Sequence, residues 1–133
     1  MATPYQERKI ADPVMNVGDE PYFEAAAQGR LLIKKCGDCG EVHFHPRGIC
    51  PFCLSDKVSW QDAKGTGKIY TYSVTRRAGP TPYCIAYVTL DEGVSMMSNI
   101  VDCDLDAIRI GQPVKVVFKK SAGGVSVPMF TPA

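Results

Sequence analysis

A chain of 133 residues, 45% of them hydrophobic, is long enough to bury one core and falls in the size range of a single domain. Fifteen basic and fourteen acidic residues give a formal net charge of +1, which argues against nucleic acid or an anionic membrane as the partner. No apolar run approaches the roughly 20 residues of a membrane span, and the N-terminus lacks the apolar centre of a signal peptide. We therefore expect a cytoplasmic protein with no membrane contact.

The N-terminal third begins with an arm. Residues 1–18 show no hydrophobic periodicity, which predicts an extended segment that becomes ordered only when another surface receives it. The stretch DEPYFEAAAQGR (19–30) predicts a helix, because Asp19 can cap the first free amides, Pro21 is tolerated in the first turn and Gly29 fits the left-handed C-terminal position. So short a helix must pack against another surface, such as a partner. Its apolar face would consist of Tyr22, Phe23, Ala26 and Ala27.

RLLIKKC (30–36) predicts a strand that leads into CGDCGEVHFHPRGICPFC (36–53). This stretch holds two Cys-x2-Cys pairs, and in a reducing compartment such pairs are typical of metal ligands rather than of disulfides. Four thiolates form the tetrahedral shell of a structural zinc in a ribbon. Iron in a rubredoxin-like site and free thiols are the alternatives. The predicted ligands are Cys36, Cys39, Cys50 and Cys53.

The predicted zinc is structural, because a catalytic zinc keeps one position open for water and four cysteines close the shell. His43 and His45 alternate on one side of a predicted strand and flank Phe44. They could transfer protons or hold a second metal, or they could be a partly exposed pair that bonds a thiolate or a backbone carbonyl. We favour the second interpretation, since no nucleophile or carboxylate stands near them in the sequence.

The segment after the second cysteine pair predicts a strand at 58–60 and a break at Gly65–Gly67. Beyond that break the sequence is β-prone, and Asp91-Glu92-Gly93 is a hairpin signal. Residues 104–113 predict a loop or helical turn. The predicted strands of this part cover 68–75, 83–90, 93–101, 114–120 and 125–130. Five short strands predict an antiparallel barrel of the OB-fold type.

The predicted fold class is therefore mainly β. We divide the chain into an arm, helix and lead-in strand (1–35), a zinc ribbon (36–64) and a five-stranded antiparallel OB-fold (65–133).

Other side chains offer weaker signals. Arg76 and Arg77 follow a predicted strand and could hold a phosphate of coenzyme A, or they could be a solvated pair at a hairpin end. Tyr70 and Tyr72 share one predicted strand face, as do Tyr83 and Tyr87. These tyrosines could stack single-stranded bases, but the neutral charge favours barrel core or a partner interface.

Two further cysteines stand alone. Cys84 has no visible activating base, so a buried core thiol is favoured over a nucleophile. Cys103 lies between Asp102 and Asp104, whose charges should raise its pKa. Met96 and Met97 should point to opposite strand faces, so that at least one of them lies in the core.

The order of these motifs resembles a known family from about residue 18 onward. The first motifs in this order are the helix ending in glycine (PYFEAAAQGRLLIKKC) and the cysteine stretch with HPR before the third cysteine. A Gly-Thr-Gly entry to a strand follows, and then come PYCIAYVTLDEG and IRIGQPVKVVF. The chain is similar to fused rubredoxin-like zinc ribbon and OB-fold proteins of acyl-CoA metabolism, long catalogued as a domain of unknown function.

The resemblance implies a non-catalytic accessory subunit that assembles with a thiolase-like or related acyl-CoA enzyme, such as a hydratase or an aldolase, and helps to shape its acyl-CoA site. A coenzyme A thioester would then lie at the interface. It carries over the four zinc ligands and brings no catalytic motif. The alternatives are a stand-alone OB-fold module that binds acyl-CoA or single-stranded nucleic acid, and an iron-containing electron carrier.

Overall fold

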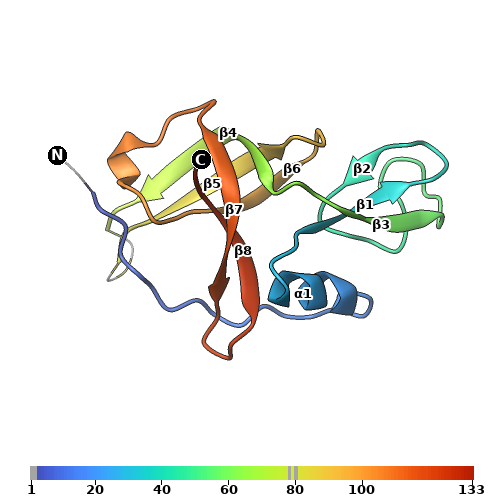
Figure 1. Ribbon diagram of the computed structural model, residues 1–133, viewed down its shortest axis with the longest axis horizontal. Coiled ribbons are helices and arrows are strands. Elements are labelled where there is room, and N and C mark those ends of the chain that lie inside the picture. Colours follow the sequence, from blue (N-terminus) through green and yellow to red (C-terminus); the bar gives the residue numbers. More distant parts are fainter. Residues whose placement is uncertain (1–2, 78, 80) are drawn as a thin grey trace.

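The computed structural model describes residues 3–77, 79 and 81–133 and contains two β units with a helix beside them (Figure 1). A three-stranded sheet has the strand order β2-β1-β3, and a closed barrel has the order β4-β5-β6-β8-β7. The elements are α1 (Glu20–Ala27), β1 (Leu32–Cys36), β2 (Val42–His43), β3 (Val58–Asp62), β4 (Thr66–Thr75), β5 (Tyr83–Leu90), β6 (Ser95–Ile100), the 3-10 helix η1 (Leu105–Ala107), β7 (Pro113–Lys120) and β8 (Ser126–Pro132). In the described residues no helix is long and apolar enough to cross a membrane.

Helix α1 ends as its sequence predicts but begins differently. Gly29 adopts a left-handed φ of 78°, and the N–H of Arg30 donates to the carbonyl of Ala25 at 2.9 Å, which closes the helix in a Schellman motif. Asp19, however, makes no side-chain cap to the helix. Its carboxylate instead accepts from the backbone N–H of Asn16 at 3.0 Å. The predicted N-terminal cap is therefore wrong.

The buried face of α1 consists of Tyr22, Ala25 and Ala26. These positions are spaced i, i+3 and i+4, so they lie on one side of the helix. Phe23 is half-buried and Ala27 is exposed. One alanine of the predicted apolar face is thus corrected: Ala25 is buried in place of Ala27. The reason is that the helix packs through Tyr22 rather than through Phe23.

Strand β1 is the centre of the ribbon sheet and pairs antiparallel with β2 and β3. The ammonium of Lys34 lies 4.5 Å from the centre of the Trp60 ring across the β1–β3 pair. Leu32 and Ile33 are buried in the same hydrophobic cluster as the barrel interior. The ribbon is therefore attached to the barrel through apolar packing as well as through the chain.

The barrel confirms the OB-fold prediction. Its pairings are antiparallel except for one parallel contact between β6 and β8 at Ile100 and Phe130, which closes it. The predicted turn is present, since Gly93 has φ 92° and its N–H donates to the Leu90 carbonyl at 2.8 Å. Gly67 lies inside β4 rather than in the predicted break. Glycine is required at this position because a Cβ would collide with the backbone of Thr89 on β5.

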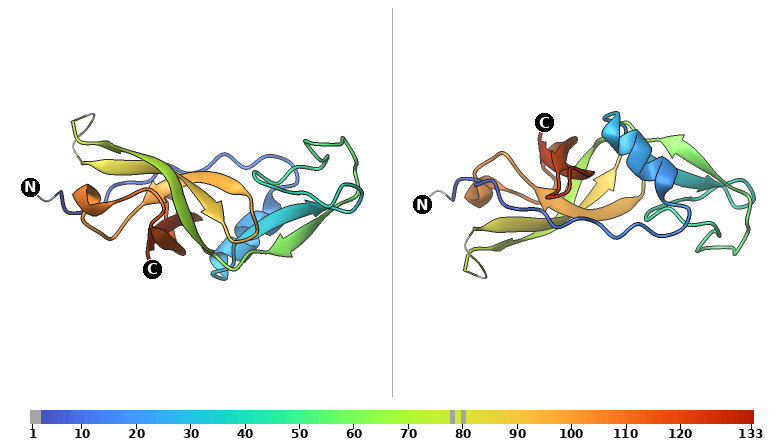
Figure 2. Two further views of the ribbon diagram at one scale, coloured as in Figure 1. Left: turned by 90° about the horizontal axis from the view of Figure 1, so that it is seen from above. Right: turned by 90° about the horizontal axis from the view of Figure 1, so that it is seen from below.

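The N-terminal arm lies along the chain's own barrel (Figure 2). The N–H of Tyr5 donates to the Cys103 carbonyl at 3.1 Å. The carboxylate of Asp12 accepts from the Ser121 hydroxyl at 2.6 Å and from the Gly123 N–H at 2.7 Å. The surface that receives the arm is thus the chain's own barrel, which offers backbone donors and acceptors beside β6, β7 and β8.

Candidate metal centre

The two cysteine pairs form two knuckles with the same backbone pattern. The N–H of Gly40 donates to the Cys36 carbonyl at 3.0 Å, and the N–H of Leu54 donates to the Cys50 carbonyl at 3.0 Å. Gly40 and Leu54 both adopt left-handed φ angles, 77° and 66°. Each knuckle therefore turns on the residue after its second cysteine, and the turn presents both sulfurs to the same point.

The four sulfurs of Cys36, Cys39, Cys50 and Cys53 lie within 4.8 Å of one another. The Sγ atoms of Cys36 and Cys53 are 3.6 Å apart, as are those of Cys39 and Cys50. A zinc ion with four Zn–S bonds of about 2.3 Å requires sulfurs about 3.8 Å apart, so the cluster fits a tetrahedral thiolate site. The chain thus contains a zinc-ribbon domain whose four cysteines are placed to hold one metal ion.

Electrostatics at the cluster favour partial ionisation. The backbone N–H of Cys39 lowers the pKa of the Cys36 thiol to about 6. Backbone N–H groups also favour the thiolates of Cys39 and Cys53, but burial and the neighbouring sulfurs outweigh them and raise the pKa of both, that of Cys39 to about 12. A divalent cation would remove this competition by stabilising all four thiolates.

His43 and His45 are not a pair on one strand, because β2 ends at His43. Phe44 and His45 turn away toward α1, where their rings lie 5.8 and 5.5 Å from the ring of Tyr22. His43 is buried, and its Nε2 accepts from the backbone N–H of Arg47 at 3.2 Å. The predicted bond to a thiolate or a carbonyl is therefore corrected to one from a backbone amide.

Burial lowers the pKa of His43, so its imidazole is neutral at pH 7 and carries its proton on Nδ1. Within the described residues this Nδ1 has no hydrogen-bond partner. His43 thus links β2 to the following loop through the backbone N–H of Arg47.

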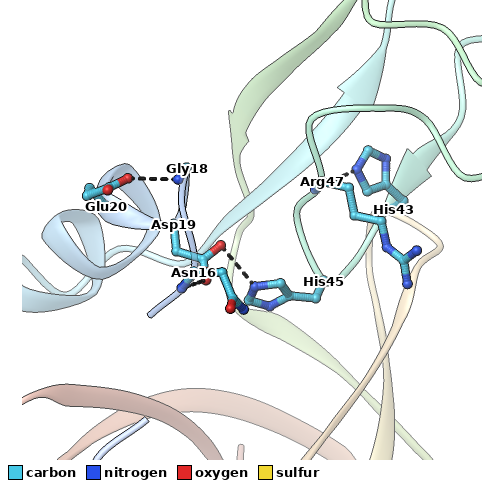
Figure 3. Close-up of polar contacts among 7 residues, drawn as sticks. All are labelled: Asn16, Gly18, Asp19, Glu20, His43, His45 and Arg47. Atoms are coloured by element: carbon cyan, nitrogen blue, oxygen red, sulfur yellow. Dashed lines mark hydrogen bonds and ion pairs between the residues drawn. The ribbon is translucent and has the colours of Figure 1, made fainter. Parts of the chain in front are cut away.

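A carboxylate does lie beside His45, although the sequence places none there. Oδ1 of Asp19 is 3.4 Å from Nε2 of His45 (Figure 3). The two residues are 26 positions apart, so no local motif could reveal the contact. The pKa of Asp19 is lowered, first by the backbone N–H of Asn16 and further by His45. The pair ties the start of α1 to the ribbon.

The predicted phosphate ligands differ in what they contact. Arg76 forms an ion pair with Asp106, which holds its guanidinium at the end of β4 next to η1. Arg77 is exposed. Both arginines are thus exposed, and they differ in that Arg76 is paired with Asp106 whereas Arg77 has no ion pair among the described residues.

The isolated cysteines and methionines agree with the interpretations favoured from sequence. Cys84 is fully buried, and burial raises the pKa of its thiol to about 11. Burial raises the pKa of Cys103 as well, with further contributions from Asp104 and Asp102. Met96 is buried and Met97 is exposed.

The four tyrosines of β4 and β5 are not in the barrel core. Tyr70, Tyr72 and Tyr87 are exposed, and Tyr83 is half-buried. Tyr72 lies opposite the inward-facing Ala86, so it does not share a face with Tyr70 as the alternation predicted. A β-bulge between Ile69 and Thr71 is the reason.

Comparison with known proteins gives consistent matches. A family model described as "ChsH2, rubredoxin-like zinc ribbon domain" matches residues 23–59, and one described as "ChsH2, C-terminal OB-fold domain" matches residues 60–119. A "DUF35 domain-containing scaffold protein" of Methanothermobacter thermautotrophicus is 44% identical over 98 residues, which cover 68% of this chain and 72% of the relative.

A "Probable enoyl-CoA hydratase alpha subunit" of Thermomonospora curvata is 35% identical over 125 residues, or 91% of this chain. The match covers 39% of that relative, so the chain spans about two fifths of its length. A solved structure described as "Ltp2-ChsH2(DUF35) aldolase" contains a similar chain, with a TM-score of 0.78 and 34% identity over 91% of this chain and 98% of that one. The chain thus belongs to the DUF35 family, with a ChsH2-type zinc ribbon followed by an OB-fold.

Proposed function

We propose that this chain is a non-catalytic, zinc-containing accessory subunit that assembles with an acyl-CoA-processing enzyme and helps to shape its acyl-CoA site. The observation that carries the proposal is the match along nearly the whole length of the ChsH2 (DUF35) chain of an aldolase that also includes Ltp2. The scaffold names of the archaeal relatives support the same role.

The metal part of the proposal assigns one structural zinc to the four cysteines of the ribbon. Their spacing fits a closed tetrahedral shell, and such a shell leaves no position for substrate or water. The zinc would fix the two knuckles relative to each other. Chemistry on the acyl group would then belong to the partner enzyme.

The partner would be an enzyme that acts on an acyl-CoA substrate. The similar proteins are named for a hydratase and for an aldolase, which supports an acyl-CoA enzyme in general. A thiolase-like partner remains one form of the proposal. The proposal also includes a coenzyme A thioester at the interface between the two chains. Arg77 is the better candidate than Arg76 for binding its phosphates, because Arg76 is paired with Asp106.

The proposal includes the division of the chain at residues 35 and 64 and a cytoplasmic location. The first unit would be 1–35, the ribbon 36–64 and the OB-fold 65–133. The end of β3 at Asp62 and the start of β4 at Thr66 support the second boundary. Six cysteines with no disulfide among them suit a reducing compartment.

Affinity purification of the tagged chain from its native host, followed by mass spectrometry, tests the proposed function. We expect an acyl-CoA enzyme in a fixed stoichiometric ratio, with full activity only when both chains are present. Recovery of the chain alone would contradict the accessory role. The lone protein would then be titrated with acyl-CoA and with single-stranded DNA to test the stand-alone alternative.

A further inference from the structure

The outward face of β4, β5 and β6 carries a patch of exposed apolar side chains, and we call it the β4–β6 face. Its members are exposed by 68% (Tyr70), 38% (Ile85), 46% (Tyr87) and 60% (Met97). Tyr87 lies directly opposite Met97 on β6, so the two share one side of the sheet. Ile85 is two residues before Tyr87 on β5 and points the same way.

The β-bulge in β4 presents Tyr70 on this face. Ile69 is opposite Val88 and Thr71 is opposite Tyr87, which leaves Tyr70 as the extra residue without a partner in β5. Bulges redirect side chains. As a result Tyr70 is the most exposed tyrosine of β4, β5 and β6. Tyrosines in such positions are frequent anchors of protein interfaces.

Charge is nearly absent from these strands. Lys68 is the one charged residue in β4, β5 and β6, whereas 22% of the whole chain is charged. Single-stranded nucleic acid and anionic membranes require clustered cations, which the β4–β6 face lacks. Depletion of charge together with tyrosine and methionine is the composition of a protein interface core. The occupant that fits is thus a protein.

A hollow at the edge of the β4–β6 face offers a cationic side chain to an incoming protein. It has a volume of about 330 Å³, and Ile85 and Met97 line it together with Arg8 and Tyr83. The guanidinium of Arg8 lies 4.1 Å from the centre of the Tyr83 ring. No ion pair to Arg8 occurs among the described residues. A carboxylate of the incoming protein could therefore pair with it.

We propose that the β4–β6 face is the surface by which this chain docks on its enzyme partner. The partner would contribute an uncharged apolar segment that covers Tyr70, Tyr87 and Met97, and a carboxylate that meets Arg8 at the hollow. This inference rests on the proposed function, since the enzyme is the occupant. The barrel is closed, so the contact is made by side chains and not by an added strand (Figure 1).

The test measures the affinity of the full-length chain for the enzyme that copurifies with it. Met97→Asp places a charge in the middle of the face and should raise Kd by about 30-fold or more, the effect of losing an interface hot spot. Ile110→Asp is the matched control, because Ile110 is 70% exposed outside the face, and its Kd should stay within about twofold of the wild type. Tyr70→Ala is a second variant should Met97→Asp fail to fold.

The hollow is tested by charge reversal at two adjacent exposed positions. Arg8→Glu should weaken binding by roughly tenfold, whereas Lys9→Glu, with the same change in net charge, should not. Equal binding by all these variants would overturn the docking face while leaving the accessory function intact. Recovery of the wild-type chain without an enzyme would overturn both. A wild-type dimer that Met97→Asp converts to a monomer in sedimentation would replace the enzyme by a second copy as the occupant and overturn the proposal.

Discussion

The six cysteines of this chain differ through their surroundings. Four of them stand at the ends of two knuckles, where backbone N–H groups point toward sulfur and the sulfurs meet. Cys84 points into the barrel core, where burial raises its pKa. A thiol in that position has no means of ionising near pH 7 and acts as a small apolar side chain.

Cys50→Ser tests the role of the cluster at the residue scale. Structural zinc contributes on the order of 10 kcal/mol to the folding of such ribbons, and loss of one buried thiolate should abolish most of that contribution. We expect less than one zinc per chain in elemental analysis, and a ribbon that is unfolded at 25 °C. Cys103→Ser is the matched control and should retain zinc. A Cys50→Ser variant with full zinc content and unchanged thermal unfolding would contradict the assignment.

Asp19 gives a second prediction for a single residue, in the dependence of stability on pH. Its pKa in the folded chain is lowered below the ordinary value of about 3.9, mainly by the N–H of Asn16. The carboxylate therefore stabilises the fold above about pH 5, and this stabilisation is lost as the pH falls through 3.9 toward the folded pKa.

Urea unfolding of the wild type and of Asp19→Asn between pH 6 and pH 3 measures the effect. The variant should be less stable by about 1 kcal/mol at pH 6, and the gap should narrow as the pH falls toward 3. His45→Gln should keep most of the wild-type pH dependence, because Asn16 is the larger cause. A constant gap at every pH would show that Asp19 does not titrate with folding.

At the scale of the element, the two knuckles make the same turn with different residues. The turn needs a left-handed residue after the second cysteine of each pair, and glycine supplies it at position 40. Leu54 adopts the same conformation at a steric cost of about 1 kcal/mol. Its side chain is 78% exposed, so it recovers little of that cost by packing.

Leu54→Gly should therefore stabilise the zinc-loaded chain by up to about 1 kcal/mol, part of which the greater freedom of the unfolded glycine chain offsets. Leu54→Ala is the matched control, since it removes the same apolar surface but keeps the Cβ that causes the clash. Thermal unfolding of the three proteins with bound zinc provides the comparison. A variant series in which Ala and Gly behave alike would point to loss of the side chain and away from backbone strain.

At the scale of the whole molecule, the ribbon and the barrel are held by different forces. The barrel has a closed hydrogen-bonded sheet and a buried interior that includes Ile69, Val88 and Phe130. The ribbon sheet is small, and β2 has only two residues. It gains support from Leu32 and Ile33, which pack against the barrel, and from the proposed metal.

Removal of zinc by a chelator should thus unfold the ribbon before the barrel. Trp60 is the single tryptophan of the chain and lies in β3, so its emission reports on the surroundings of this ribbon strand. We expect a red shift of this emission while the far-ultraviolet circular dichroism of the barrel persists. Simultaneous loss of both signals would mean that the two units unfold as one.

Much of this fold can be predicted from sequence because its signals are local. The paired cysteines, the glycine at position 29 and the turn at Gly93 each depend on neighbours in the chain, and each is found as predicted. The β5 limits follow from a β-prone run between turn residues. Alternation also places Met96 and Met97 on opposite faces.

Other features depend on residues that are distant in sequence, and only the tertiary structure decides them. Asp19 meets His45 and leaves the helix cap because the ribbon packs beside α1. The arm lies on the barrel because Asp12 finds hydroxyl and amide donors in the β7–β8 turn. The bulge places Tyr70 on the outward face of the barrel, where the sequence left core and partner interface open, since register across strands, and not alternation along one strand, determines which face a side chain takes.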